Sequence, residues 1–174
     1  MIYSSDDVFL IDTNSILTPY LSYYTFDFAP KFWNQLERDL TEGSIAILDL
    51  VKKEIEAGND KLSAWMNAIH TKILIDHREE AIIQKYSEVL NFIQTSGFYN
   101  DKALAKWAGN VADPWLIAAS SVYGYTIITL EQSAGGISKR NPSSNPKIPD
   151  VCNQFDVKCE GLYYMMRQLS YSLG

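Results

Sequence analysis

Short apolar runs that alternate with helix-forming stretches constrain the fold of this chain more than any other feature. The run Phe9–Ile11 ends at Asp12, and Tyr125–Leu130 contains four consecutive β-branched residues. Both runs predict buried strands, and Ser44–Leu48 predicts another. Because helical stretches separate these strands along the chain, we expect a single α/β domain over residues 1–174, built around a mostly parallel central sheet.

The helices are predicted from apolar residues at helical spacing, from prolines that begin helices and from glycines that end them. The predicted helices are Lys31–Glu42, Leu50–Ala57, Lys61–His70, Glu79–Thr95, Asp101–Ala108, Asp113–Val122, Ile148–Gln154 and Leu162–Leu169. A last strand is expected at Val157–Cys159, and residues 131–149 are expected to form a loop that carries three basic side chains.

Composition narrows the class of protein. The chain has 174 residues, with 15 basic and 21 acidic side chains and a net charge of −6, so it is poorly suited to bind nucleic acid unless cations bridge the charges. No apolar run reaches the ~20 residues that span a bilayer, and residues 1–7 lack the features of a secretory signal peptide. We therefore expect a cytoplasmic protein with no membrane partner. Cys152 and Cys159 are expected to be reduced thiols, and His70 and His77 lack the spacing of a zinc hydrolase.

Acidic residues stand where a parallel sheet collects its ligands, beyond the carboxyl ends of its strands. Asp12 ends the first predicted strand, and Glu131 lies just past the strand Tyr125–Leu130. Asp113 begins the helix that leads into that strand. If the two strands are neighbours, the three carboxyl groups face one crevice.

Helical geometry adds a fourth acid to this group. At about 100° per residue, Val51, Ile55 and Gly58 fall within ~60° of one another on the predicted helix. Glu54 borders that apolar sector, whereas Glu56 lies on the opposite side. We therefore expect Glu54 to lean inward, toward the end of the sheet, and Glu56 to point outward.

Converging carboxylates repel one another unless they are protonated or bridged by a divalent cation, and a set of oxygen ligands suits Mg²⁺ or Mn²⁺. Each acid also has an ordinary interpretation when it is taken alone. Asp12 and Asp113 could cap the helices that follow them. Glu54 could be a solvated helix residue, and Glu131 a surface charge on a loop.

These segments, in this order, resemble the PIN-domain superfamily, especially the VapC-like toxins and a PIN-like subgroup of uncharacterised relatives. The resemblance covers most of the chain. It is carried by the motifs at Phe9–Ser15, Val51–Ile55, Ala112–Ala119, Thr126–Glu131 and Pro146–Cys152.

The resemblance implies a PIN-like α/β/α sandwich and a Mg²⁺- or Mn²⁺-dependent endoribonuclease. By this resemblance Asp12, Glu54 and Asp113 would be metal-binding acids, Asn14 would help to orient the site, and Glu131 would stand at the fourth acidic position. The VapC-like relatives further imply an RNA substrate, an antitoxin protein as partner, and a homodimer.

Two other classes of function are compatible with parts of the sequence. A non-catalytic PIN-like module would bind metal or RNA without cleaving it. A phosphotransfer enzyme or receiver-like domain would use Asp12 as the phosphate acceptor. The second class is disfavoured, because the D-x-D site of haloacid-dehalogenase-type enzymes needs an aspartate where this chain has Asn14.

Overall fold

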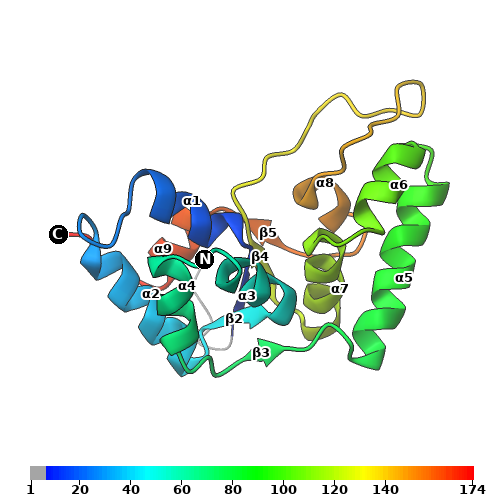
Figure 1. Ribbon diagram of the computed structural model, residues 1–174. Helices are drawn as coiled ribbons and strands as arrows, with labels where there is room; N and C mark the ends of the chain where they lie inside the picture. Colours follow the sequence, from blue (N-terminus) through cyan, green and yellow to red (C-terminus); the bar gives the residue numbers. More distant parts are fainter. Residues whose placement is uncertain (1–6) are drawn as a thin grey trace.

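A parallel sheet of five strands forms the centre of the computed structural model, which describes residues 7–174 (Figure 1). The expectation about a signal peptide rests mostly on residues 1–6, which lie outside the described residues. The strands are β1 (Phe9–Ile11), β2 (Ile45–Leu48), β3 (Leu74–Ile75), β4 (Thr126–Ile128) and β5 (Cys159–Glu160). Their order across the sheet is β3-β2-β1-β4-β5, and all adjacent pairs are parallel. The predicted parallel α/β sheet is confirmed.

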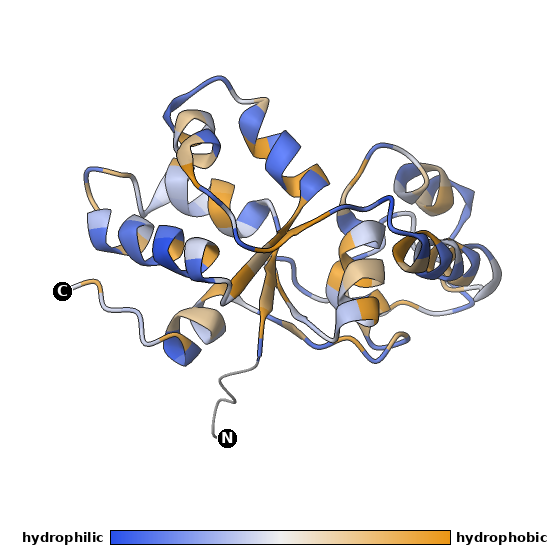
Figure 2. Cartoon of the chain, turned by 90° about the horizontal axis from the view of Figure 1, so that it is seen from below, coloured by the Kyte–Doolittle hydropathy of each residue, from blue (hydrophilic) through white to orange (hydrophobic). Residues whose placement is uncertain are grey.

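Helices connect these strands and lie on both faces of the sheet. They are α1 (Asn14–Ser22), α2 (Pro30–Glu42), α3 (Asp49–Glu56), α4 (Lys61–Ala68), α5 (Glu80–Thr95), α6 (Asp101–Trp107), α7 (Asp113–Tyr123), α8 (Ile148–Cys152) and α9 (Leu162–Gln168). In Figure 1 α1, α2, α4 and α9 form one group and α5 to α8 form the other. Figure 2 shows the apolar strands running between the two groups.

Burial explains why the two central connections were readable from sequence. All residues of β1 and β2 are buried, since helices cover both faces of the sheet, and such strands show continuous apolar runs instead of alternation. The edge strand β3 is only two residues long, too short to give a pattern, and the sequence analysis did not predict it. The other edge strand, β5, begins at Cys159, the last residue of the strand predicted there.

The strand order creates one place where the connections diverge. β1 pairs with β2 on one side and with β4 on the other, so the chain leaves the two central strands in opposite directions. Ligands of open α/β sheets bind at this kind of point, beyond the carboxyl ends of the strands.

A long loop, residues 131–147, leaves β4 at this end of the sheet. It runs out toward α5 and α6 and returns to α8 (Figure 1). Its far part is attached to the segment between those helices, because Ser143 donates its N–H to the carbonyl of Phe98 at 2.8 Å and accepts from the N–H of Asn100 at 3.1 Å. Within residues 7–174, no helix has the length and apolar character needed to cross a bilayer.

Candidate active site

Strand register places Asp12 beside Thr129. Ile11 is paired with Ile128 in the parallel ladder, so the next residue on each strand meets at the carboxyl edge of the sheet. The N–H of Asp12 donates to the carbonyl of Ile128 at 2.9 Å, and the Thr129 hydroxyl donates to Oδ2 of Asp12 at 2.7 Å. Asp12 is 5% exposed and Thr129 is 1% exposed, so this carboxyl group is fixed in a nearly dry position.

Asn14 ties the start of α1 to the same point. Its Nδ2 donates to the Thr129 hydroxyl oxygen at 3.2 Å, and its Oδ1 accepts from the N–H of Leu130 at 2.9 Å. The hydroxyl of Thr129 therefore accepts from Asn14 while it donates to Asp12. Asn14 orients the site through hydrogen bonds to β4 and the residue after it.

Glu131 is held by both ends of the loop that it begins. Its N–H donates to the Thr129 hydroxyl oxygen at 3.1 Å. Its carboxylate accepts from the N–H of Ile148 at 2.9 Å and from Nζ of Lys147 at 3.2 Å. Glu131 is consequently a fixed, partly buried group and not a free surface charge.

Asp113 begins α7 and lies within the field of the other acids. Burial raises the pKa of Asp113 to about 6, and the carboxylates of Glu131 and Glu54 act in the same direction. Lys106 and Lys147 oppose this rise in the Asp113 pKa. Asp113 thus stands between other acids and two lysines.

The pKa of Asp12 reports the same grouping. Burial raises the pKa of Asp12 to about 7, and the charges of Asp113 and Glu131 also raise it. The hydrogen bond from Thr129 counteracts this rise. A carboxyl group with such a pKa is one whose charge is poorly compensated by the protein alone.

Glu54 stands at the rim of this group. Its carboxylate accepts a hydrogen bond from the Thr13 hydroxyl, and its charge acts on Asp113. Its side chain is exposed, whereas Glu56 is half-buried and pairs with Lys52 at 3.7 Å. Glu54 therefore faces the site as expected from the helical geometry, but the expected difference in burial between the two glutamates is reversed.

The ordinary capping roles of the two aspartates are not what the helices use. Thr13 is the N-cap residue of α1, and Ala112 is the N-cap residue of α7. Asp113 is already the first residue of α7, where the positive end of the helix dipole favours a negative charge. The structure thus brings Asp12, Asp113 and Glu131 together with Glu54 at the rim, and their role as metal ligands remains a prediction.

A second group of polar side chains lies at the next strand ends. Because Leu48 pairs with Ile75, Asp49 and Asp76 follow neighbouring strands. With His77 they form a group whose ligand atoms all lie within 4.8 Å of one another, and such a group could hold a metal ion.

Bonds within the protein already compensate much of the charge of this group. Nδ1 of His77 lies 2.7 Å from Oδ2 of Asp49, and the guanidinium of Arg78 binds both oxygens of Asp76. Lys53 lies 3.7 Å from Asp49. A metal ion here would compete with these cationic groups.

The sequence analysis missed Asp49, Asp76, His77 and Thr129. Their common signal is position, since each follows a strand directly or by one further residue. That signal was unreadable for Asp76 and His77, because β3 itself was not predicted. Thr129 had been counted as part of a strand and not as a member of the site.

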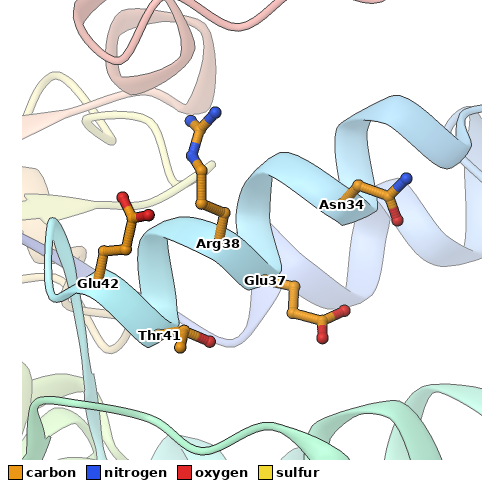
Figure 3. Close-up of a pocket in the computed structure, with 5 residues that line it drawn as sticks. All are labelled: Asn34, Glu37, Arg38, Thr41 and Glu42. Atoms are coloured by element: carbon orange, nitrogen blue, oxygen red, sulfur yellow. The ribbon is translucent and has the colours of Figure 1, made fainter.

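Surface hollows distinguish this region from the rest of the molecule. One hollow of about 270 Å³ includes Thr129 and Glu131 in its wall, and another of about 250 Å³ includes Glu54. The hollow in Figure 3, about 360 Å³, is lined by Asn34, Glu37, Arg38, Thr41 and Glu42, which all belong to α2. The α2 hollow contains none of the grouped acids, and only the first two adjoin the candidate site.

Comparison with known proteins agrees with the fold. A chain of the solved structure described as VapBC2 from Rickettsia felis, bound to a DNA fragment from their promoter, aligns with 88% of this chain and 98% of its own length. Its sequence identity is 15% and its TM-score is 0.51. The protein therefore has the PIN-like α/β/α fold that its sequence predicted.

The family model described as a domain of unknown function, DUF4411, matches residues 9–173. The chain belongs to this family. No curated protein sequence matches it.

Proposed function

We propose that this protein is a metal-dependent endoribonuclease that hydrolyses RNA phosphodiester bonds. One observation carries the proposal. Asp12 and Asp113, fixed on different elements at the carboxyl edge of the sheet, have pKa values raised to about 7 and about 6 by burial and by neighbouring acids. Grouped carboxyl groups with such pKa values are typical of functional sites.

The donor chemistry fits Mg²⁺ or Mn²⁺. Asp12, Glu54, Asp113 and Glu131 offer only carboxylate oxygens, which hard divalent cations prefer. A cation bound among them would relieve the repulsion that raises the pKa values of Asp12 and Asp113. When bound, such a metal makes hydroxide available near neutral pH and stabilises negative charge on the reacting phosphate.

The chain's own residues would position this chemistry. Thr129 and Asn14 hold Asp12 in one orientation through their linked hydrogen bonds. Lys147 pairs with Glu131 at 3.2 Å, and both Lys147 and Lys106 act on the charge of Asp113. Ammonium groups beside the acids can attract an RNA phosphate to an otherwise acidic protein.

We further propose a biological setting of the toxin–antitoxin kind. The fold neighbour is named VapBC2, and the PIN-like fold supports an antitoxin protein as partner, a cytoplasmic location and a homodimer. The continuity of the sheet from β3 to β5 and a family match over residues 9–173 support one PIN-like domain over the whole chain.

Two neighbouring glutamates provide the test. Glu54→Gln removes a charge that faces Asp113, whereas Glu56→Gln removes one that pairs with Lys52. We expect Glu54→Gln to lose most Mn²⁺-dependent cleavage of a labelled RNA, since metal binding and transition-state stabilisation weaken together. Glu56→Gln should retain this cleavage.

Both variants should remain folded by circular dichroism, and EDTA should abolish cleavage by the wild type. Equal activity of the two variants would refute the role of Glu54. Cleavage that survives full chelation would refute the metal mechanism. RNA that stays intact while Mn²⁺ binds would favour the non-catalytic PIN-like module instead.

A further inference from the structure

A hollow beside Glu54 has no role in the proposed chemistry. It measures about 250 Å³ and lies between α3 and the segment that leads into α7, lined by Leu50, Lys53, Glu54, Ala57, Asn110, Val111 and Ala112. Sites for drug-sized ligands usually occupy ~300–1,000 Å³. This hollow therefore suits a smaller, flat group.

The chemistry of its wall is divided. Leu50, Ala57, Val111 and Ala112 supply apolar surface from two different elements. Such surfaces can hold the faces of a ring between them. Polar groups stand among these apolar residues, and polar groups of this kind fix the orientation of a bound ligand.

Asn110 is the polar group with unused capacity. Its side-chain amide makes no hydrogen bond with any residue among 7–174, although it offers two donors and an acceptor. By contrast Asn14 and Asn100, the two other asparagines near helix starts, both use their side chains to bind backbone groups. Asn110 is thus available to a ligand in the hollow.

The hollow is also continuous with the candidate site through Glu54, whose charge acts on Asp113. A strand whose phosphate lies at the acids would bring an adjacent base to this place. We propose that the hollow is a subsite for one nucleobase of the RNA substrate, recognised by the Asn110 amide. This inference rests on the proposed function, because it takes the acids to hold the neighbouring phosphate.

The amide favours one base. Asparagine binds adenine through two hydrogen bonds, donating to N7 and accepting from the N6 amino group. Pyrimidines do not offer this pair of atoms on one edge. Adenosine should therefore bind more tightly than uridine or cytidine, by about tenfold.

Nucleosides titrated into the metal-free full-length protein test the subsite directly, followed by amide NMR resonances of Ala57, Val111 and Ala112. We expect adenosine to shift these resonances and Asn110→Ala to abolish its preference over uridine and cytidine. Ala57→Phe, which fills the hollow from an exposed position, should abolish the shifts. Asn34→Ala is the matched control, since Asn34 lines the separate hollow on α2 (Figure 3).

The result that would overturn the subsite is an absence of nucleoside shifts at these three residues, or shifts that Asn110→Ala leaves unchanged. Mg²⁺ titrated alone in the same spectra reports on the acids separately. Adenosine binding without any Mg²⁺ response at Asp12 and Asp113 would count against the proposed nuclease while supporting the hollow. A Mg²⁺ response without adenosine binding would refute the hollow alone.

Discussion

Replacing Asp12 with asparagine should stabilise the metal-free protein at alkaline pH. Asparagine keeps the shape of the side chain and can still accept the hydrogen bond from Thr129. It removes the charge that burial and the neighbouring acids Asp113 and Glu131 disfavour. A substitution at the centre of a functional site is thus expected to increase stability, as happens where function requires unfavourable charge.

The magnitude follows from the pKa of Asp12, which is raised from 3.8 to about 7. Because the folded state holds the proton more tightly, stability falls as pH rises from the unfolded pKa to the folded pKa. The full cost above the folded pKa is about 4 kcal/mol at 1.36 kcal/mol per unit. The part that develops between about pH 5 and about pH 8 is roughly 2–3 kcal/mol.

Urea denaturation in EDTA at these two pH values measures the effect. The advantage of Asp12→Asn over the wild type should grow by roughly 2–3 kcal/mol on going to the higher pH. Asp39→Asn is a useful contrast, because Asp39 is equally buried but paired with Arg38 at 3.0 Å, so its neutralisation should destabilise the protein. A pH-independent difference between Asp12→Asn and wild type would refute the reasoning.

Two further predictions concern the side chains around these acids. Thr129→Val should cost about 2 kcal/mol of unfolding free energy, because Asn14 and Asp12 lose a buried partner, whereas Thr129→Ser should retain it; equal losses in a denaturant titration would contradict this role. Lys147→Met should raise the pKa of Asp113 above about 6, since an opposing positive charge is removed. A carboxyl ¹³C NMR titration that finds the Asp113 pKa unchanged or lower would contradict the assignment of Lys147.

Much of this site was predictable because buried parallel strands have a plain sequence signature. The apolar run of β1 ends at Asp12, and the β-branched run of β4 ends beside Glu131, so both acids could be placed at one edge of the sheet. Asp113 followed from the proline after it, which begins a helix. These predictions needed only local pattern and the rule that parallel strands share their carboxyl edge.

The remaining features depend on tertiary structure. β3 has two residues and gives no periodicity, so Asp76 and His77 could not be placed beside Asp49. For Glu54 and Glu56, helical geometry fixed the angle around α3, but the packing of neighbouring elements sets exposure. The hydroxyl of Thr129 gained its role only when strand register brought it beside Asp12.

An Mn²⁺-bound crystal structure with an anomalous difference map tests the central claim most directly. The account predicts a strong peak within coordination distance of Asp12 and Asp113, with Glu54 or Glu131 contributing oxygens. A peak at Asp49, Asp76 and His77 instead, with none near Asp12, would contradict it and would move the metal to the second group.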